Sequence, residues 1–256
     1  MKNPIVNMQQ VTTELDQIVE IRGISKSFGD SNILTKVELC VKRGENVVVL
    51  GKSGSGKSTL IKCMIGLMEP DEGEIIVFGK DIAGLSYREL NEVRKKMGFL
   101  FQSAALYDSM TVRENLEFPL RHNKHGLSAA ERYSMVLEAL EQVGLTDSVD
   151  KMPAELSGGM SKRIGLARTL ILGPEIMLYD EPTTGLDTAT AKEISQLILD
   201  MQRKNNISSI IITHDMNCAR MTADRIVMLN EGVIVAEGSY ETLARSDDGF
   251  IQSFFN

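Results

Sequence analysis

Short apolar runs, rich in β-branched residues, recur along the chain between glycines and charged residues. Runs of this length and composition predict β-strands, several of them buried on both faces. The predicted strands are Ile18–Ile24, Ile33–Val41, Val47–Leu50, Ile75–Phe78, Ile176–Tyr179, Ile207–Thr213, Ile226–Leu229 and Val233–Ala236. The last two flank Asn230-Glu231-Gly232 and predict a hairpin. Turns are expected at Lys26–Asp30, which includes Phe28, at Lys42–Glu45 and at Pro70–Glu74.

Helical spacing of apolar residues appears in four other places. It follows the glycine-rich stretch 51–58, it fills residues 133–143 and 194–201, and it follows the Ser-Gly-Gly at 157–159. Ser128-x-x-Glu131 is a capping box that opens the second of these helices, and Gly144 is a suitable stop. Because the middle of the chain reads as helical while both flanks contain strands, we expect a helical subdomain over about 103–165.

The domain limits follow from these patterns. Residues 1–17 are polar and aperiodic and predict a loose tail. Residues 18–246 are expected to form a single α/β domain, and 247–256 a short apolar tail. That tail is expected to pack on its own domain, with a partner contact as the alternative.

Composition narrows the class of protein. The chain has 256 residues with 43% hydrophobic and 25% charged residues, which is ordinary for a folded domain. A net charge of −7 argues against a nucleic-acid partner, which would need a basic face. No apolar stretch has the length of a membrane span, and the N-terminus lacks a signal-peptide pattern. Three widely spaced cysteines suggest neither a disulfide framework nor a metal site.

The strongest chemical signal is Gly51-Lys52-Ser53-Gly54-Ser55-Gly56-Lys57-Ser58, which lies between a predicted buried strand and a predicted helix. This is the phosphate-binding P-loop in the context it requires. Backbone N–H groups and the helix N-terminus would hold phosphate oxygens, Lys57 would supply a cation, and the Ser58 hydroxyl would bind Mg²⁺. The predicted nucleotide-binding residues of the loop are Gly51, Ser53, Gly54, Ser55, Gly56, Lys57, Ser58 and Thr59.

Two acidic residues follow another predicted strand. Asp180 and Glu181 come directly after Ile176–Tyr179, and open α/β sheets bind ligands at the carboxyl ends of their strands. We expect Asp180 to hold Mg²⁺ and Glu181 to act as general base on the attacking water. The alternative is a pair of acids in an exposed turn.

A second anion site is predicted at Ser157-Gly158-Gly159, which begins a helix. One nucleotide does not need two such sites from one chain. A symmetric dimer, in which each chain's Ser-Gly-Gly closes on the partner's nucleotide, accounts for both. The alternative is an ordinary helix N-cap with flexible glycines.

The order of these motifs, with Gln102, Thr184-Gly185-Leu186-Asp187 and His214, resembles the nucleotide-binding subunit of an ABC transporter over about residues 18–246. The resemblance implies an α/β P-loop NTPase (RecA-like) core, an N-terminal antiparallel β subdomain and an inserted α-helical subdomain. It also implies ATP and Mg²⁺ as ligands and ATP hydrolysis coupled to a membrane permease.

The same resemblance assigns further residues. Phe28 would stack on adenine, although a phenylalanine is by default a core residue. Gln102 would touch Mg²⁺ and the attacking water and report to the permease; otherwise it is a surface amide.

Two more residues follow from it. Asp187 would lie at the dimer interface, and it could also cap the helix that starts at Thr188. His214 would contact the γ-phosphate and orient Glu181, so that Glu181, His214 and Lys57 form the catalytic set; the alternative is a structural histidine.

A narrower resemblance is to the Mla-type phospholipid transport ATPases, which work with Mce-domain proteins. It rests on Leu100–Tyr107, Met110–Leu116 and Phe118–Leu120, and on Met160, which replaces the usual glutamine of the signature. It implies a homodimer bound peripherally to the cytoplasmic face of a bacterial inner membrane. The partners that it implies are a permease, an Mce-domain lipid-binding protein and, as an optional further component, a small regulatory subunit. There are two alternatives. One is another ABC transporter, for an amino acid, metal or cell-envelope substrate, and the other is a soluble ABC ATPase in translation or DNA repair.

Overall fold

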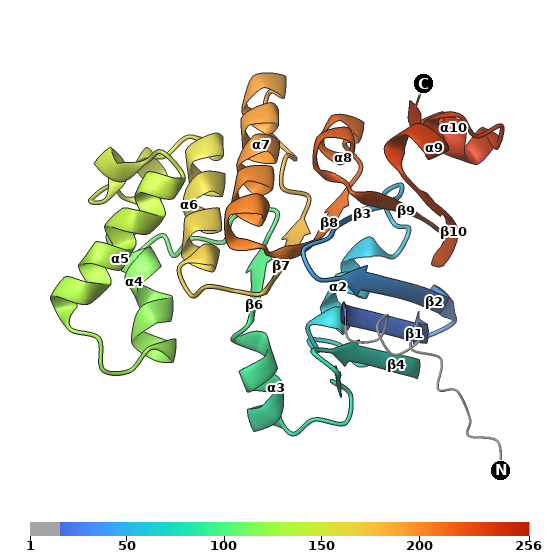
Figure 1. Cartoon of the computed structure of the whole chain (residues 1–256), viewed down its shortest axis with the longest axis horizontal. Helices are drawn as coiled ribbons and strands as arrows, with labels where there is room; N and C mark the ends of the chain where they lie inside the picture. The colour runs from blue at the N-terminus through green and yellow to red at the C-terminus, as the bar shows by residue number, and fades with distance from the viewer. Residues whose placement is uncertain (1–15, 256) are drawn as a thin grey trace, which may run out of the picture.

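The computed structural model describes residues 16–255 (Figure 1). Its strands form two sheets, one of four strands and one of six. Of the tail predicted for residues 1–17, the first fifteen lie outside the described residues, while Gln17 already begins strand β1. This arrangement confirms the predicted α/β class with an antiparallel subdomain near the N-terminus.

The antiparallel sheet has the order β2-β1-β4-β5. Its strands are β1 (Gln17–Phe28), β2 (Ser31–Lys42), β4 (Glu72–Val77) and β5 (Lys80–Asp81). Two predicted turns were placed too widely. β1 continues through Phe28, which pairs with Ser31, so that only Gly29 and Asp30 turn the chain. β4 begins at Glu72 because Arg22 and Ser25 of β1 offer it ladder partners.

The larger sheet has the order β10-β9-β3-β8-β7-β6. Its parallel strands are β3 (Asn46–Leu50), β6 (Met97–Leu100), β7 (Ile176–Asp180), β8 (Ser208–Thr213) and β9 (Arg225–Asn230), and β10 (Val233–Gly238) closes the hairpin. Every residue of β3 and β8 is buried. Such strands read as continuous apolar runs because helices or another sheet cover both faces.

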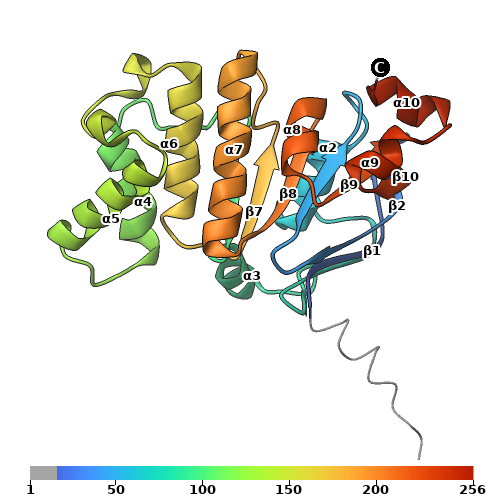
Figure 2. The ribbon, with the colours of Figure 1, turned by 45° about the horizontal axis from the view of Figure 1, so that its top comes forward.

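Helix α2 (Lys57–Met64) lies between the two sheets. Leu60, Ile61 and Met64 share one core with residues of both sheets. The opposite face of the larger sheet is covered by α7 (Thr188–Asn205), α8 (Met216–Thr222) and part of α6 (Gly158–Leu170), as Figure 2 shows. α3 (Tyr87–Arg94), which the sequence did not predict, precedes β6.

The helical subdomain has its own apolar cluster, built from α4 (Val112–Asn123), α5 (Ala129–Gln142) and α6. The predicted capping box at Ser128 is present, and Gly144 follows the helix with a φ of 68°. Two short 3₁₀ turns, Thr146–Ser148 and Pro153–Glu155, join α5 to α6. α6 runs five residues beyond the expected limit of 165 because its last turn packs in the same cluster.

The last described residues are helical rather than a plain tail. α9 (Tyr240–Ala244) leads to α10 (Gly249–Phe255). Ile251 is buried, and Phe250, Phe254 and Phe255 pack against the core that lies under α7 and α8. Within residues 16–255 the structure has no helix with both the length and the apolarity to cross a bilayer.

Candidate functional site

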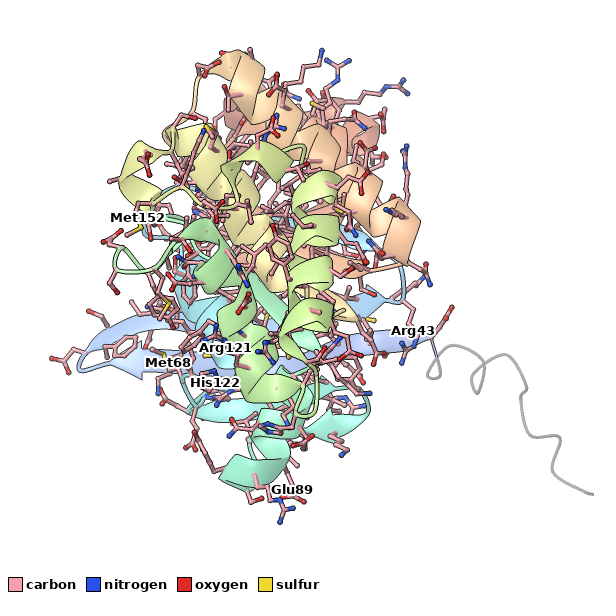
Figure 3. All side chains as sticks on the ribbon, turned by 90° about the vertical axis from the view of Figure 1, so that its left-hand side faces the viewer. Arg43, Met68, Glu89, Arg121, His122 and Met152 are labelled. Atoms are coloured by element: carbon pink, nitrogen blue, oxygen red, sulfur yellow. The ribbon has the colours of Figure 1, made fainter. Side chains whose placement is uncertain are left out.

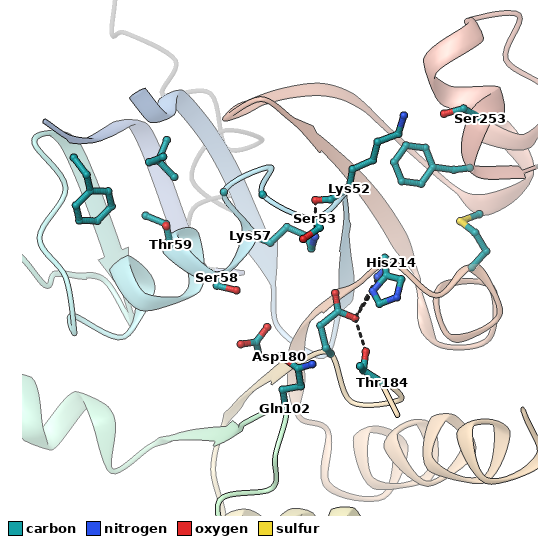
Figure 4. Close-up of a pocket in the computed structure, with 17 residues that line it drawn as sticks. Lys52, Ser53, Lys57, Ser58, Thr59, Gln102, Asp180, Thr184, His214 and Ser253 are labelled. Atoms are coloured by element: carbon teal, nitrogen blue, oxygen red, sulfur yellow. Dashed lines mark hydrogen bonds and ion pairs between the residues drawn. The ribbon is translucent and has the colours of Figure 1, made fainter. Parts of the chain in front are cut away.

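A cavity of about 780 Å³ opens where β3, β7 and β8 end at their carboxyl edge (Figure 4). A ligand of nucleotide size fits this volume. The cavity collects predicted residues from five separate parts of the chain. They are Phe28, Ser53, Gly54, Gly56, Lys57, Ser58, Thr59, Gln102, Asp180, Glu181 and His214.

The P-loop adopts a backbone that requires glycine. Gly54 and Gly56 have φ values of 80° and 104°, in the left-handed region that side chains disfavour. A Cβ on Gly56 would lie 2.7 Å from the carbonyl oxygen of Ile33. The loop then enters α2, whose first turn has neither a side-chain cap nor an acidic residue. Its N–H groups are therefore available to an anion, and these residues fit a phosphate chain.

Lys57 is the cation at the floor of the cavity. Its side chain curls back so that Nζ donates to the carbonyl oxygens of Gly51 (2.7 Å) and Lys52 (3.0 Å). Burial lowers the pKa of Lys57, and the nearby carboxylates of Asp180 and Glu181 oppose that shift. The ammonium is thus held on backbone oxygens at the mouth of the loop, where a phosphate oxygen is a stronger acceptor.

The carboxylate of Glu181 is held by two neighbouring side chains. Its Oε2 lies 2.9 Å from Nδ1 of His214 and accepts a hydrogen bond of 3.2 Å from the Thr184 hydroxyl, as the dashed lines in Figure 4 show. The carboxylate side chain is 13% exposed, whereas His214 is 61% exposed. The predicted pairing of Glu181 with His214 is therefore present, and Glu181 is neither free nor in an exposed turn.

Asp180, Ser58 and Gln102 are the residues proposed for Mg²⁺, and all three line the cavity. Burial, followed by the charge of Glu181, raises the pKa of Asp180. No group of three His, Cys, Asp or Glu that could hold a metal occurs among residues 16–255. One carboxylate, a hydroxyl and an amide suit Mg²⁺ bound together with substrate phosphates and water rather than in an all-protein cage.

Phe28 also lines the cavity, and it is 49% exposed at the end of β1. Lys26 Nζ lies 5.8 Å from the centroid of its ring. The alternative of a core phenylalanine therefore does not hold. An exposed aromatic face beside a phosphate-binding loop is available to stack on a planar base.

The structure does not bring the Ser-Gly-Gly and Asp187 into this cavity, but it places them beside each other. Ser157 caps α6 by accepting from the Met160 N–H, and Asp187 caps α7 by accepting from Ala189 and Thr190. The Thr190 hydroxyl donates to Asp187 at 2.6 Å, and a Cβ on Gly159 would lie 2.5 Å from Thr190 Cγ2. Hydrogen bonds from Thr190 lower the pKa of Asp187. Ser157 and Asp187 therefore both act as helix N-caps within one chain, as their alternative interpretations expected.

Several residues of the site were not predicted individually. The cavity is also lined by Ile33, Lys52, Thr184, Met216, Ser253 and Phe254. Thr184 lies in the predicted motif 184–187, so spacing could have pointed to it. Ser253 and Phe254 come from the end of α10, and no sequence signal indicates that this end reaches the P-loop.

Comparison with known proteins identifies the family. The family model described as "ABC transporter" matches residues 34–184. The "Probable ribonucleotide transport ATP-binding protein mkl" of Mycobacterium leprae is 43% identical over 239 residues, which are 93% of this chain and 68% of that protein. The "Methionine import ATP-binding protein MetN" of Rhizobium johnstonii is 40% identical over 233 residues, 91% of this chain and 64% of that protein.

Solved structures show the same fold. The dimeric post-hydrolysis structure of the ATP-binding cassette MJ0796, bound to ADP and Pi, has a TM-score of 0.80 at 35% identity, covering 86% of this chain and 98% of that one. CbiO1 of Clostridium perfringens, part of the transporter complex CbiONQ, has a TM-score of 0.82 at 30% identity, covering 90% and 92%. The chain belongs to the ABC transporter family, as an ATP-binding subunit that hydrolyses ATP with Mg²⁺.

Proposed function

We propose that this chain energises a membrane permease for phospholipids, in the maintenance of cell-envelope lipid asymmetry, in a complex of the Mla/Mce type. The observation that carries the ATPase part is the meeting of Lys57, Glu181 and His214 at one cavity. The lipid part is supported by the stretch from Leu100 to Leu120 and by Met160 in the signature. Relatives named for ribonucleotide transport and for methionine import make those cargoes the competing outcomes.

The polar side chains around the P-loop have distinct roles in this proposal. The P-loop N–H groups and Lys57 would bind the β- and γ-phosphates. Asp180, Ser58 and Gln102 would hold Mg²⁺, which would supply positive charge beside the phosphate oxygens. Glu181 accepts a proton from the attacking water. His214 and Thr184 both contact the same Glu181 oxygen, so they fix its direction.

The dimer proposal is supported by which groups remain accessible. Ser157, Gly158 and Asp187 are exposed in the single chain, although their motif is the second anion site. In the proposed dimer each chain's Ser157-Gly158-Gly159 covers the γ-phosphate held by its partner's P-loop. MJ0796 is dimeric in its ADP- and Pi-bound structure, which supports a dimer of this chain.

A permease-facing surface is proposed at the loop that contains Gln102. Phe101 and Tyr107 are 43% and 44% exposed, and the Tyr107 ring lies 4.9 Å from that of Phe118 on α4. The His122 ring lies 4.3 Å from that of Phe118, and His122 lies on α4 beside Arg121 (Figure 3). An exposed aromatic cluster that adjoins a site residue offers a permease both anchorage and a route to the nucleotide.

The deciding experiment is a pull-down of the tagged chain from detergent-solubilised membranes, with mass spectrometry of its partners. We expect a polytopic permease together with an Mce-domain protein. A permease with an amino-acid-binding or nucleoside-binding protein would assign a different cargo to the transporter and leave the ATPase assignment intact. Activity only in the soluble fraction, stimulated by DNA or ribosomes, would contradict the transport proposal.

The base-stacking role of Phe28 is tested separately. Stacking on an aromatic ring contributes about 1–3 kcal/mol per base, so Phe28→Ala should weaken ATP binding about 5- to 150-fold while turnover at saturation changes little. Phe28→Trp should keep the affinity. Tyr87→Ala, at a residue that is 78% exposed on α3, is the matched control. Equal ATP affinity in wild type and Phe28→Ala would remove Phe28 from the site.

A further inference from the structure

Lys162 is a buried lysine that no motif of the nucleotide site includes. It lies on α6, four residues after Gly158, and it is 5% exposed. Burial lowers the pKa of Lys162, and the carboxylates of Asp180 and Glu181 oppose that shift. A buried ammonium is retained only where acceptors or opposite charges compensate its lost hydration.

The acceptors are two backbone carbonyls of the nucleotide site. Lys162 Nζ donates to the carbonyl oxygen of Gln102 and, at 3.3 Å, to that of Glu181. One side chain therefore joins the backbone of a proposed Mg²⁺ ligand to the backbone of the proposed base. It does so from the helix that begins with the Ser-Gly-Gly.

The loop after Gln102 needs such support because its backbone is strained. Ala104 and Ala105 have φ values of 59° and 48°, and left-handed conformations are costly for residues with a Cβ. Arg168, also on α6, donates to the carbonyl oxygens of both at 2.8 Å. A Cβ on Gly165 would lie 3.0 Å from Ala104 Cβ, so α6 packs tightly on the loop.

Glu181 is strained in the same sense. Its φ is 50°, and its N–H donates to the Ile212 carbonyl at 2.8 Å. Lys162 holds the carbonyl on the other side of the residue. The direction of the Glu181 carboxylate is thus set by bonds on both of its peptide groups, besides His214 and Thr184. Small displacements of such a group lower the catalytic rate strongly.

We propose that Lys162 is a positioning residue for hydrolysis. It fixes the backbones of Gln102 and Glu181 relative to α6, the helix that begins with the Ser-Gly-Gly. The proposal rests on the roles given above to Gln102 and Glu181. Motion of α6 when the dimer closes then reaches both residues through one ammonium group. Arg168 fixes the loop to the same helix but does not contact Glu181, so its role is confined to the loop.

The test compares Lys162→Met with Lys162→Arg in the full chain. Methionine keeps the apolar stem and removes the donor, so we expect kcat to fall about 10- to 100-fold. The Kd for ATP should stay within about twofold, because no P-loop contact is lost. The Mg²⁺ concentration for half-maximal turnover should rise with the displacement of Gln102. Arginine retains donors and should restore part of kcat.

Lys204→Met, at an exposed residue near the end of α7, controls for the introduced methionine. Wild-type kcat in Lys162→Met would overturn the proposal. So would a joint loss of ATP affinity, kcat and thermal stability that arginine does not rescue, since that pattern describes a purely structural lysine. Turnover of the wild type and of Glu181→Gln tests the roles proposed for the site. A failure of those roles would appear in these two proteins, whereas a failure of the Lys162 proposal would appear only in the Lys162 variants.

Discussion

Glu181→Gln is expected to bind ATP, to stop hydrolysis and to accumulate as a closed dimer. Glutamine has nearly the shape of glutamate and can still contact His214 and Thr184, but it cannot accept the proton of the attacking water. Loss of a positioned general base lowers turnover about 100- to 10,000-fold. The phosphate-binding groups are untouched, so ATP remains bound and the two chains stay closed on it.

The measurement has two parts. Phosphate release under saturating ATP and Mg²⁺ gives kcat, and size-exclusion chromatography with and without ATP gives the fraction of dimer. Glu141→Gln, at an exposed carboxylate on α5, is the matched control and should hydrolyse normally. Normal hydrolysis by Glu181→Gln would assign the base to another residue. Loss of hydrolysis without an ATP-dependent dimer would support Glu181 as the base and contradict the proposed dimer.

The motifs of the site were predictable because each is local. A P-loop specifies strand, glycine turn, cation and helix within about a dozen residues, and the structure builds them at the expected place. Asp180 and Glu181 were predictable for the same reason, since the end of a buried strand fixes where they lie. His214 was placed by the motif order, and its bond to Glu181 follows from the adjacency of β7 and β8.

What the sequence did not predict has a different reason for each element. α4 was missed because its buried Val112, Leu116 and Leu120 recur only once per turn and Pro119 interrupts them. Phe28 was placed in a turn because ladder partners on β2, not local propensity, extend β1 to it. Lys162 carries no signal in the sequence, because a lysine on a helix is by default exposed.

Lys57 is expected to decide nucleotide affinity. Lys57→Ala removes the only side-chain cation that the structure, within residues 16–255, holds on the P-loop carbonyls of Gly51 and Lys52. Hydrogen bonds to charged groups contribute about 1.5–3 kcal/mol, so we expect ATP affinity to fall about 10- to 150-fold. Turnover should fall at least as far, because charge on the phosphate oxygens grows toward the transition state.

Isothermal titration with ATP measures the affinity, and thermal unfolding shows whether the P-loop still folds. Lys57→Met fills more of the space left by the side chain and serves as the second variant, while Lys80→Ala, exposed on β5, is the control. Both Lys57 variants should lose affinity for ATP more than for adenosine, because adenosine binding depends on Phe28 and not on the loop. ATP affinity equal to wild type in a folded Lys57 variant would contradict the assignment of this loop as the phosphate site.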